Sequence, residues 1–217
     1  MKRLVSLTLA LFVLPTVALA AGGSHDETER LNRADMALAK RAAVRKSDLF
    51  PGWRLVSSGP PKSSDFPCAF DPDLSAFVIT GKYETTFSHS GGFAQIVSEV
   101  GVFRSVRDAA GDFRASAKPG FMRCLKVAVV TGLRQAGLKA RITSSRMATT
   151  PRVGAQSVSY HLVAKTSATQ RVPSFRMYTD VLAFRQGRSQ ALLLFMSPAV
   201  KVGGQASLAR SVARRMR

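Results

Sequence analysis

Three side chains that could act together in catalysis fall on two consecutive predicted strands. His161 lies on the first strand, and Tyr178 and Asp180 lie on the second. An imidazole held by a carboxylate is an arrangement used in general acid–base catalysis. The same residue types also form structural hydrogen bonds across a sheet, and we favour that interpretation. A hydrolase-type enzyme acting on a polyanionic or lipidic substrate through His161 and Asp180 is the alternative hypothesis.

The sequence after residue 20 carries no motif of a common enzyme class. The patterns G-x-S-x-G, H-E-x-x-H, Walker A and G-x-G-x-x-G do not occur there. Asp71 and Asp73 flank Pro72, but no EF-hand spacing follows them, which favours a role in turn formation. We therefore predict a non-enzymatic protein with no catalytic residue, no metal and no cofactor.

The N-terminus has the pattern of a cleavable signal peptide. Lys2 and Arg3 precede an apolar stretch that ends in the A-x-A site Ala18-Leu19-Ala20. An uncleaved anchor is disfavoured because the apolar stretch is short for a membrane span. We expect a secreted or extracytoplasmic protein, cut after Ala20, with no transmembrane segment. The predicted parts are residues 1–20 as signal peptide, 21–25 as a flexible leader and 26–217 as a single domain.

The two cysteines, Cys68 and Cys124, would meet an oxidising environment after export. We predict a disulfide between them. In the chain-entropy model, closing this 57-residue loop stabilises the fold by about 4 kcal/mol. Two buried free thiols are the alternative, and a metal site is disfavoured because no CxxC or HxxxH spacing accompanies the cysteines.

The formal charge of +19 is concentrated in the C-terminal half. Residues 113–217 contain 19 Lys or Arg and a single acid, Asp180. This asymmetry predicts a positive surface that binds anionic polymers or lipids, while export disfavours intracellular nucleic acid as the partner. The alternative is mutational enrichment in arginine, scattered over the surface. The residues predicted to bind polyanions are Lys139, Arg141, Arg176, Arg210, Arg214, Arg215 and Arg217.

Hydrophobic periodicity predicts a mixed fold. A helix is predicted from Asp26 onward, with Leu31, Ala34, Leu38 and Ala42 on its apolar face. Later segments alternate as strands do, and the unbroken apolar run at 191–196 is typical of a central strand covered on both sides. The expected order is helix, strand, two strands, two helices, four strands and helix. We predict the α+β class, with a largely antiparallel sheet and helices packed on it.

Several short motifs follow one another in an order that resembles the PknH-like extracellular sensor domains of exported actinobacterial proteins. They are D-L-F-P-G-W at 48–53, Cys68 in a proline-rich loop, V-F-R-S-V-R-D-A at 102–109, P-G-F-M-R-C-L at 119–125 and Y-T-D-V-L-A-F-R-Q-G-R at 178–188. The resemblance covers residues 26–217 and implies a PsbP-like fold with a twisted antiparallel sheet. It also implies a ligand-sensing or carrier role. Those domains typically have two disulfides, whereas this chain can form only one.

Together these observations predict a secreted binding or sensing module for an envelope or extracellular ligand. The expected partners are an anionic envelope polymer, a lipid headgroup or a small lipophilic ligand.

Overall fold

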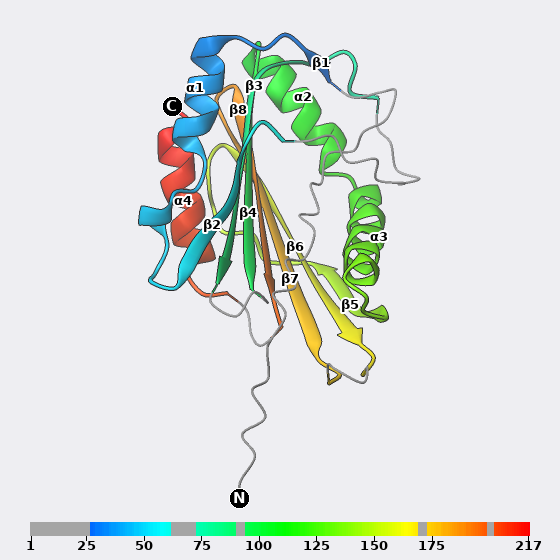
Figure 1. Ribbon diagram of the computed structural model, residues 1–217. Helices are drawn as coiled ribbons and strands as arrows, with labels where there is room; N and C mark the ends of the chain where they lie inside the picture. Colours follow the sequence, from blue (N-terminus) through cyan, green and yellow to red (C-terminus); the bar gives the residue numbers. More distant parts are fainter. Residues whose placement is uncertain (1–26, 62–72, 90–93, 169–172, 199–201) are drawn as a thin grey trace, which may run out of the picture.

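The computed structural model describes residues 27–61, 73–89, 94–168, 173–198 and 202–217 (Figure 1). Its elements, in chain order, are β1 (Thr28–Glu29), α1 (Arg33–Ala42), the 3-10 helix η1 (Lys46–Asp48), β2 (Trp53–Gly59), β3 (Val78–His89), β4 (Gln95–Phe103), α2 (Val106–Ser116), α3 (Pro119–Gln135), β5 (Ala140–Met147), β6 (Gln156–Thr166), β7 (Arg176–Gln186), β8 (Ser189–Ser197) and α4 (Gln205–Arg215). This confirms the predicted order of major elements, to which β1 and η1 are additions.

The strands form a single eight-stranded sheet in the order β1-β3-β4-β8-β7-β6-β5, and β2 also pairs with β3. All strand pairs are antiparallel except β1 with β3. The last strand, β8, lies between β4 and β7, so β1–β4 from the first half of the chain occupy one side of the sheet and β5–β8 from the second half occupy the other. The predicted α+β class and largely antiparallel sheet are therefore confirmed.

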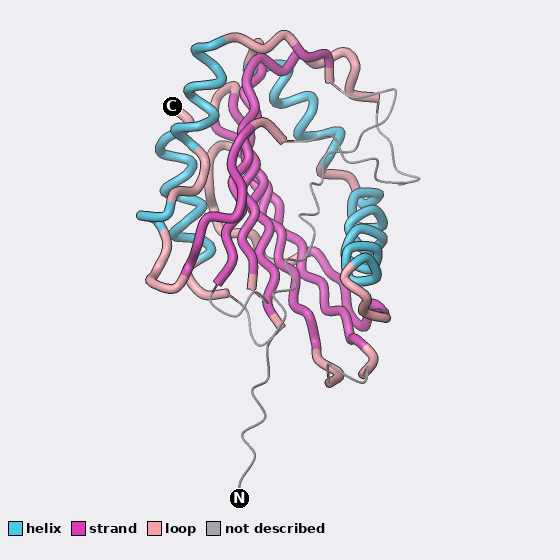
Figure 2. The backbone as a smooth tube through the Cα atoms, viewed as in Figure 1, coloured by secondary structure: helices cyan, strands magenta, loops and turns pink. Residues whose placement is uncertain are grey.

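Helices cover both faces of the sheet (Figures 1 and 2). Helices α1 and α4 pack on one face, while α2 and α3 pack on the other. On the first face α1 lies over β3 and β4, and α4 lies over β7 and β8. On the second face α2 lies against β4, β7 and β8, and α3 lies against β5 and β6.

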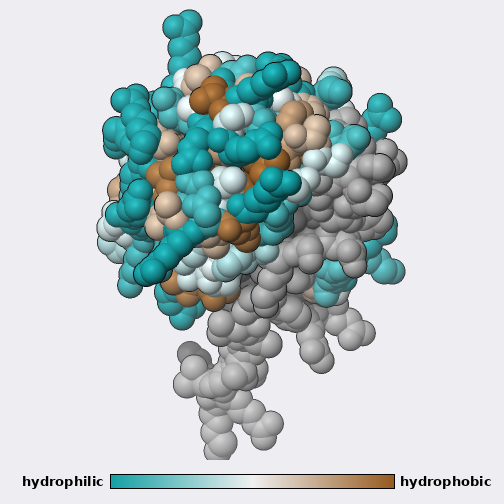
Figure 3. Space-filling view, turned by 90° about the horizontal axis from the view of Figure 1, so that it is seen from above, coloured by the Kyte–Doolittle hydropathy of each residue, from teal (hydrophilic) through white to brown (hydrophobic). Residues whose placement is uncertain are grey.

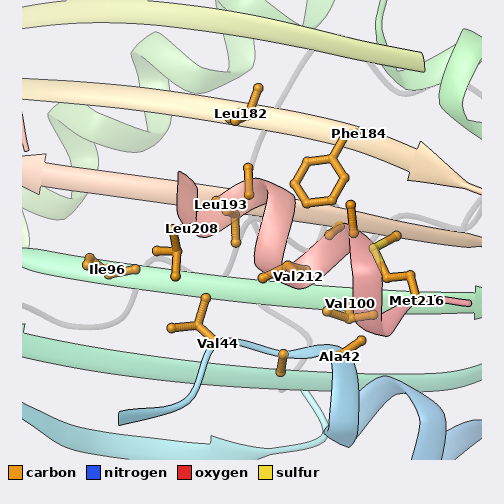
Figure 4. Close-up of a cluster of buried hydrophobic side chains, with 14 of the residues drawn as sticks. Ala42, Val44, Ile96, Val100, Leu182, Phe184, Leu193, Leu208, Val212 and Met216 are labelled. Atoms are coloured by element: carbon orange, nitrogen blue, oxygen red, sulfur yellow. The ribbon is translucent and has the colours of Figure 1, made fainter. Parts of the chain in front are cut away.

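The core on the α1–α4 face follows the strand alternation (Figure 4). Val212 of α4 and Met216, the residue that follows α4, point toward the sheet, where Val100, Leu193 and Phe184 come from three neighbouring strands. All of these side chains are almost fully buried. Burying an aliphatic or aromatic side chain of this size contributes roughly 1.5–3 kcal/mol relative to leaving it exposed. Trp53, the only tryptophan, belongs to this core.

The start and orientation of α1 differ from the prediction. The helix begins at Arg33, after Asn32 caps it by accepting a hydrogen bond from the Asp35 backbone N–H at 3.0 Å. Leu31 and Ala34 are exposed, whereas Asp35 is buried. The buried carboxylate of Asp35 is paired with the guanidinium of Arg188, which immediately precedes β8. This guanidinium holds the pKa of the Asp35 carboxyl far below its usual range.

The surface seen from above is mostly hydrophilic, with apolar side chains in small separate groups (Figure 3). Exposed large apolar residues in the described part of the chain are scattered over several elements; they are Leu31, Phe50, Leu55, Val56, Val106, Val127 and Met147. Scattered exposed apolar residues of this kind are normal for a folded protein surface. None of the described helices is both long enough and apolar enough to cross a membrane.

Candidate functional site

Two hydroxyl groups are buried without a hydrogen-bond partner among the described residues. They are the phenol of Tyr160 on β6 and the Oγ1 of Thr179 on β7. Tyr160 is 1% exposed and Thr179 is fully buried. Burial in apolar surroundings raises the pKa of the Tyr160 phenol. Most buried hydroxyls in proteins have a protein or water partner, so two unpartnered ones on adjacent strands require an explanation.

Strand register places both hydroxyls on the same face of the sheet. Tyr160 pairs with Val181 and Leu162 pairs with Thr179, so Tyr160 and Thr179 are diagonal neighbours on adjacent strands. In such pairs the Cβ atoms lie roughly 7–8 Å apart, or somewhat less. Because residues two apart share a face, the apolar side chains of Val181 and Leu162 line the sheet beside the two hydroxyls.

Helix α3 covers this part of the sheet with apolar side chains. Its Phe121 ring lies 5.2 Å from the Tyr160 ring, centroid to centroid. Leu125, Val129 and Leu133 belong to the same buried cluster as Tyr160. Phe121 itself is only partly buried, at the end of α3 where α2 and α3 meet. The hydroxyls therefore lie in an apolar layer whose side chains are buried except at Phe121, which is partly exposed to solvent.

A second polar group lies on the same face, under α2. Glu84 of β3 and Glu99 of β4 are directly opposite each other in the sheet. Burial raises the pKa of both carboxyls, that of Glu99 to about 7, and the charge of Glu84 adds to the shift of Glu99. The Oε2 of Glu84 has no hydrogen-bond partner among the described residues.

Asp112 on α2 completes this acidic group. It is 4% exposed and accepts a hydrogen bond from the Gln190 side-chain amide at 2.7 Å. Burial, and then the neighbouring carboxyl of Glu27, raise the pKa of Asp112 to about 8. The described residues contain no cluster of His, Cys, Asp and Glu that could hold a metal ion. The α2–α3 face thus presents carboxyls with raised pKa values at one end and unpartnered hydroxyls at the other.

The predicted His161–Asp180 pair forms in the structure. Nδ1 of His161 lies 2.6 Å from Oδ1 of Asp180, and Gln205 of α4 donates to the other oxygen of Asp180 at 2.9 Å. Tyr178 lies beside the histidine, with 6.4 Å between ring centroids. No Ser, Thr or Cys side chain in the described part of the chain hydrogen-bonds to His161. His161, Asp180 and Gln205 form a hydrogen-bonded group on the α1–α4 side of the sheet, and the Tyr178 ring lies beside it.

The seven residues predicted to bind polyanions do not form a single cluster. Arg141 and Arg176 project from the same face of β5 and β7, and Lys139 lies just before β5. Arg210, Arg214 and Arg217 are exposed on α4 or at its end. Arg215 is engaged elsewhere, because its guanidinium donates to Asp48 at 2.8 Å and to the carbonyls of Ala42 and Ala43.

The cysteine prediction falls partly outside the described residues. Cys124 is buried in the first turns of α3, and no cysteine in the described part of the chain is a free thiol. Cys68 lies outside the described residues. The Cys68–Cys124 bridge therefore stays a prediction, as do the signal peptide and the leader at residues 1–25.

Comparison with solved structures places this geometry in a known fold. The chain shares its fold with the extracellular domain of PknH from Mycobacterium tuberculosis. The match has a TM-score of 0.54 and covers 83% of this chain and 95% of that domain, at 9% sequence identity. No family model and no curated protein sequence matches the chain. The resemblance to PknH-like domains expected from the short motifs is thus confirmed at the level of the fold.

The buried polar groups of the α2–α3 face were not predicted from the sequence. Alternation indicates that Tyr160 faces inward, and nothing in the sequence indicates whether its hydroxyl finds a partner. Lys82 and Thr86 flank Glu84 on its strand face, so the sequence pattern does not mark Glu84 as buried, and Glu99, between Val97 and Gly101, is the one carboxyl that the pattern could have marked. A carboxyl in the middle of a covered strand requires compensation or a function.

Proposed function

We propose that this protein is an extracytoplasmic, non-enzymatic binding module for a small lipidic molecule that inserts between α3 and the sheet. The observation that carries the proposal is the pair of buried, unpartnered hydroxyls of Tyr160 and Thr179 in an apolar layer. Both groups can donate, so they suit a ligand with an apolar body and an oxygen acceptor, such as a carbonyl or carboxylate.

Energetics supports a ligand at this position. An unsatisfied buried polar group costs roughly 1–3 kcal/mol, and a ligand acceptor would remove that cost. Small-molecule sites are typically apolar with a few placed polar groups, as the α3-covered face is. The partly buried Phe121 lies next to Tyr160 and is therefore the side chain whose displacement would admit a ligand.

The extracytoplasmic assignment rests on two further observations. The N-terminal residues have the composition of a signal peptide. A solved structure that shares this fold, that of PknH, is itself an extracellular domain. Both are consistent with a ligand taken from the envelope or the medium.

Binding of cis-parinaric acid, a fluorescent fatty acid, tests the proposal. We expect fluorescence enhancement with the wild-type protein and a roughly two- to tenfold weaker Kd for Tyr160→Phe, since one hydrogen bond contributes about 0.5–1.5 kcal/mol. Thr179→Val should weaken binding similarly. Tyr178→Phe is the matched control, because that tyrosine lies on the opposite face, and its Kd should not change. Equal affinity of all four proteins, or no binding by the wild type, would refute the proposal.

The alternative function is hydrolysis through His161 and Asp180, favoured by their 2.6 Å contact. Hydrolysis of bis-p-nitrophenyl phosphate or p-nitrophenyl butyrate by the purified protein, lost in His161→Gln, would support this alternative. A rate that is unchanged in this variant would remove it.

A further inference from the structure

A row of three cations crosses the sheet on the face opposite the candidate site. Arg141 of β5 is the direct partner of Lys165 of β6, which is in turn the direct partner of Arg176 of β7. Side chains of directly paired residues project from the same face, and neighbouring strands lie about 4.8 Å apart. Three positive side chains are therefore held within roughly 10 Å by the backbone itself.

A fourth cation extends this row along the strands. Arg146 of β5 pairs with His161 of β6, which shares the face of Lys165 because the two are four residues apart. At about 3.3 Å per residue, His161 lies roughly 13 Å along β6 from Lys165. We call Arg141, Arg146, Lys165 and Arg176 the basic sheet face.

The basic sheet face has no internal neutralisation. All four of its side chains are exposed, and none of them enters an ion pair with any described residue. The single acidic side chain of residues 113–217, Asp180, is already bonded to His161 and Gln205. Like charges directly opposite each other in a sheet are destabilising, so an anion bound across the row would relieve a repulsion built into the register.

Helix packing leaves this face open but recessed. The helix that packs on β5 and β6 is α3, and it lies on the other face with Ile142, Leu162 and Ala164. On the basic side α4 covers β7 and β8, while β5–β7 extend away from it at the lower right of Figure 1. A helix with its side chains is about 10 Å across, so α4 forms a step beside the open strands.

Helix α4 carries a further cation, Arg210, whose position follows from that of Arg215 on the same helix. Arg215 reaches from α4 toward α1 and η1, where it contacts Ala42 and Asp48. Arg210 precedes Arg215 by five residues, which places it about 140° around the helix, on the flank away from α1. Exposed Arg210 therefore lies on the side of α4 that borders the open strands.

We propose that the basic sheet face binds a linear, phosphate-bearing polymer that runs along β5 and β6 beside α4. Guanidinium groups match phosphate oxygens in a bidentate manner, which favours phosphate over other anions. A flat membrane would meet α4 before it reached the recessed strands, whereas a single polymer chain fits beside the helix. This site is separate from the α3-covered face, so either proposal can fail without the other.

Charge-matched variants test the assignment, with long-chain inorganic polyphosphate as the probe. The row variant carries Arg141→Gln, Lys165→Gln and Arg176→Gln. The control carries Arg107→Gln, Arg114→Gln and Arg123→Gln, which remove three exposed charges from α2 and α3. We expect at least tenfold weaker binding for the row variant at low salt, with the control within about threefold of wild type. The slope of log K against log salt should fall by about two in the row variant alone.

Two further probes distinguish sources of phosphate. Orthophosphate should bind much more weakly than the polymer, and vesicles of phosphatidylglycerol and phosphatidylcholine should bind no better to wild type than to the row variant. Circular dichroism and the thermal midpoint confirm that each variant is folded. Equal losses in the row and control variants would show that net charge alone acts, which would overturn the proposal. Orthophosphate binding as tight as polymer binding, or vesicle binding that depends on the row, would overturn the assignment to a linear polymer.

Discussion

At the scale of single residues, the unpartnered hydroxyl of Tyr160 leads to a stability prediction. In the protein without ligand this group loses water without gaining a partner among the described residues. Tyr160→Phe removes the hydroxyl and keeps the ring beside Phe121. We expect the free energy of unfolding to rise by about 1 kcal/mol, measured by urea denaturation.

The matched control is Tyr178→Phe on the opposite face, which should leave the free energy of unfolding unchanged within about 0.5 kcal/mol. A loss of more than about 1 kcal/mol in Tyr160→Phe would show that the hydroxyl is satisfied, and would remove the basis of the proposed ligand site.

The carboxyl of Glu99 leads to a pH prediction. Burial, followed by the charge of Glu84, raises its pKa to about 7 in the folded protein, from 4.5 for a free side chain. The folded state therefore holds a proton that the unfolded state releases as pH rises above 4.5. This contribution is fully present below that pH and is lost as pH rises through about 7. Glu99 should therefore lower the free energy of unfolding by on the order of 2 kcal/mol between about pH 5 and pH 8, and Asp112, whose pKa is also raised, acts in the same direction.

Glu99→Gln isolates this effect, because glutamine stays neutral throughout. The free energy of unfolding of Glu99→Gln should increase relative to that of the wild type as pH rises from about 5 to 8. Urea denaturation over a pH series measures this difference. Asp35 and Asp48 have lowered pKa values, and their ion pairs are lost only at lower pH, outside this window. Parallel pH profiles for the two proteins would contradict a protonated Glu99.

Residue-level features were predictable where strand pairing alone decides them. The contact of His161 with Asp180 followed from two consecutive strands whose register brings the residues opposite each other. The unpartnered state of Tyr160 and Thr179 could not be predicted, because it depends on everything that surrounds the hydroxyls. The same holds for Arg215, which the sequence places on an exposed helix face and the fold places against Asp48.

At the scale of elements, sequence patterns predicted the strands better than the first helix. Alternation fixes which strand face is buried, and Ser105 caps α2 as expected, accepting from the Asp108 backbone N–H at 3.0 Å. The predicted apolar face of α1 was right for Leu38 and Ala42, which pack in the core, and wrong for Leu31 and Ala34, where Asp35 is buried instead and paired with Arg188. Lys165 was missed because its neighbours Arg141 and Arg176 are adjacent only in the folded sheet.

The close approach of α1 to β3 leads to a packing prediction. A Cβ at Gly81 of β3 would lie 2.3 Å from the backbone carbon of Asp35, which cannot move without shifting the helix. Gly81→Ala should therefore destabilise the fold by about 1–3 kcal/mol, seen as a lower thermal midpoint. Gly203→Ala is the control, since a Cβ at that position would meet nothing within 4 Å, and its midpoint should stay close to wild type. Equal midpoints for the two variants would mean that α1 does not pack this closely.

At the scale of the whole molecule, the charge asymmetry of the sequence becomes an asymmetry of the sheet. Strands β5, β6 and β7 come from the basic half and occupy one edge, while β1, β2, β3 and β4 come from the other half. The fourth strand of the basic half, β8, lies next to β7 and pairs with β4 at the middle of the sheet, so the strands of the two halves do not interleave. The positive charge is therefore neither evenly scattered nor gathered in one patch. Part of it lies on the open edge of the sheet, and part, as in Arg188 and Arg215, forms the ion pairs that hold α1 and η1.

A bridge between Cys68 and Cys124 would tie a 57-residue segment that spans β3, β4 and α2. A crosslink of this length restricts the unfolded chain and stabilises the fold by about 4 kcal/mol in the chain-entropy model. We expect the thermal midpoint of the exported protein to fall on reduction, and to be equally low in Cys68→Ser with or without reductant. Peptide mass spectrometry under non-reducing conditions should show the linked pair. Two titratable thiols in the unfolded, unreduced protein would contradict the bridge, and would leave the α2–α3 face to be held by packing of side chains such as Leu125 and Val129.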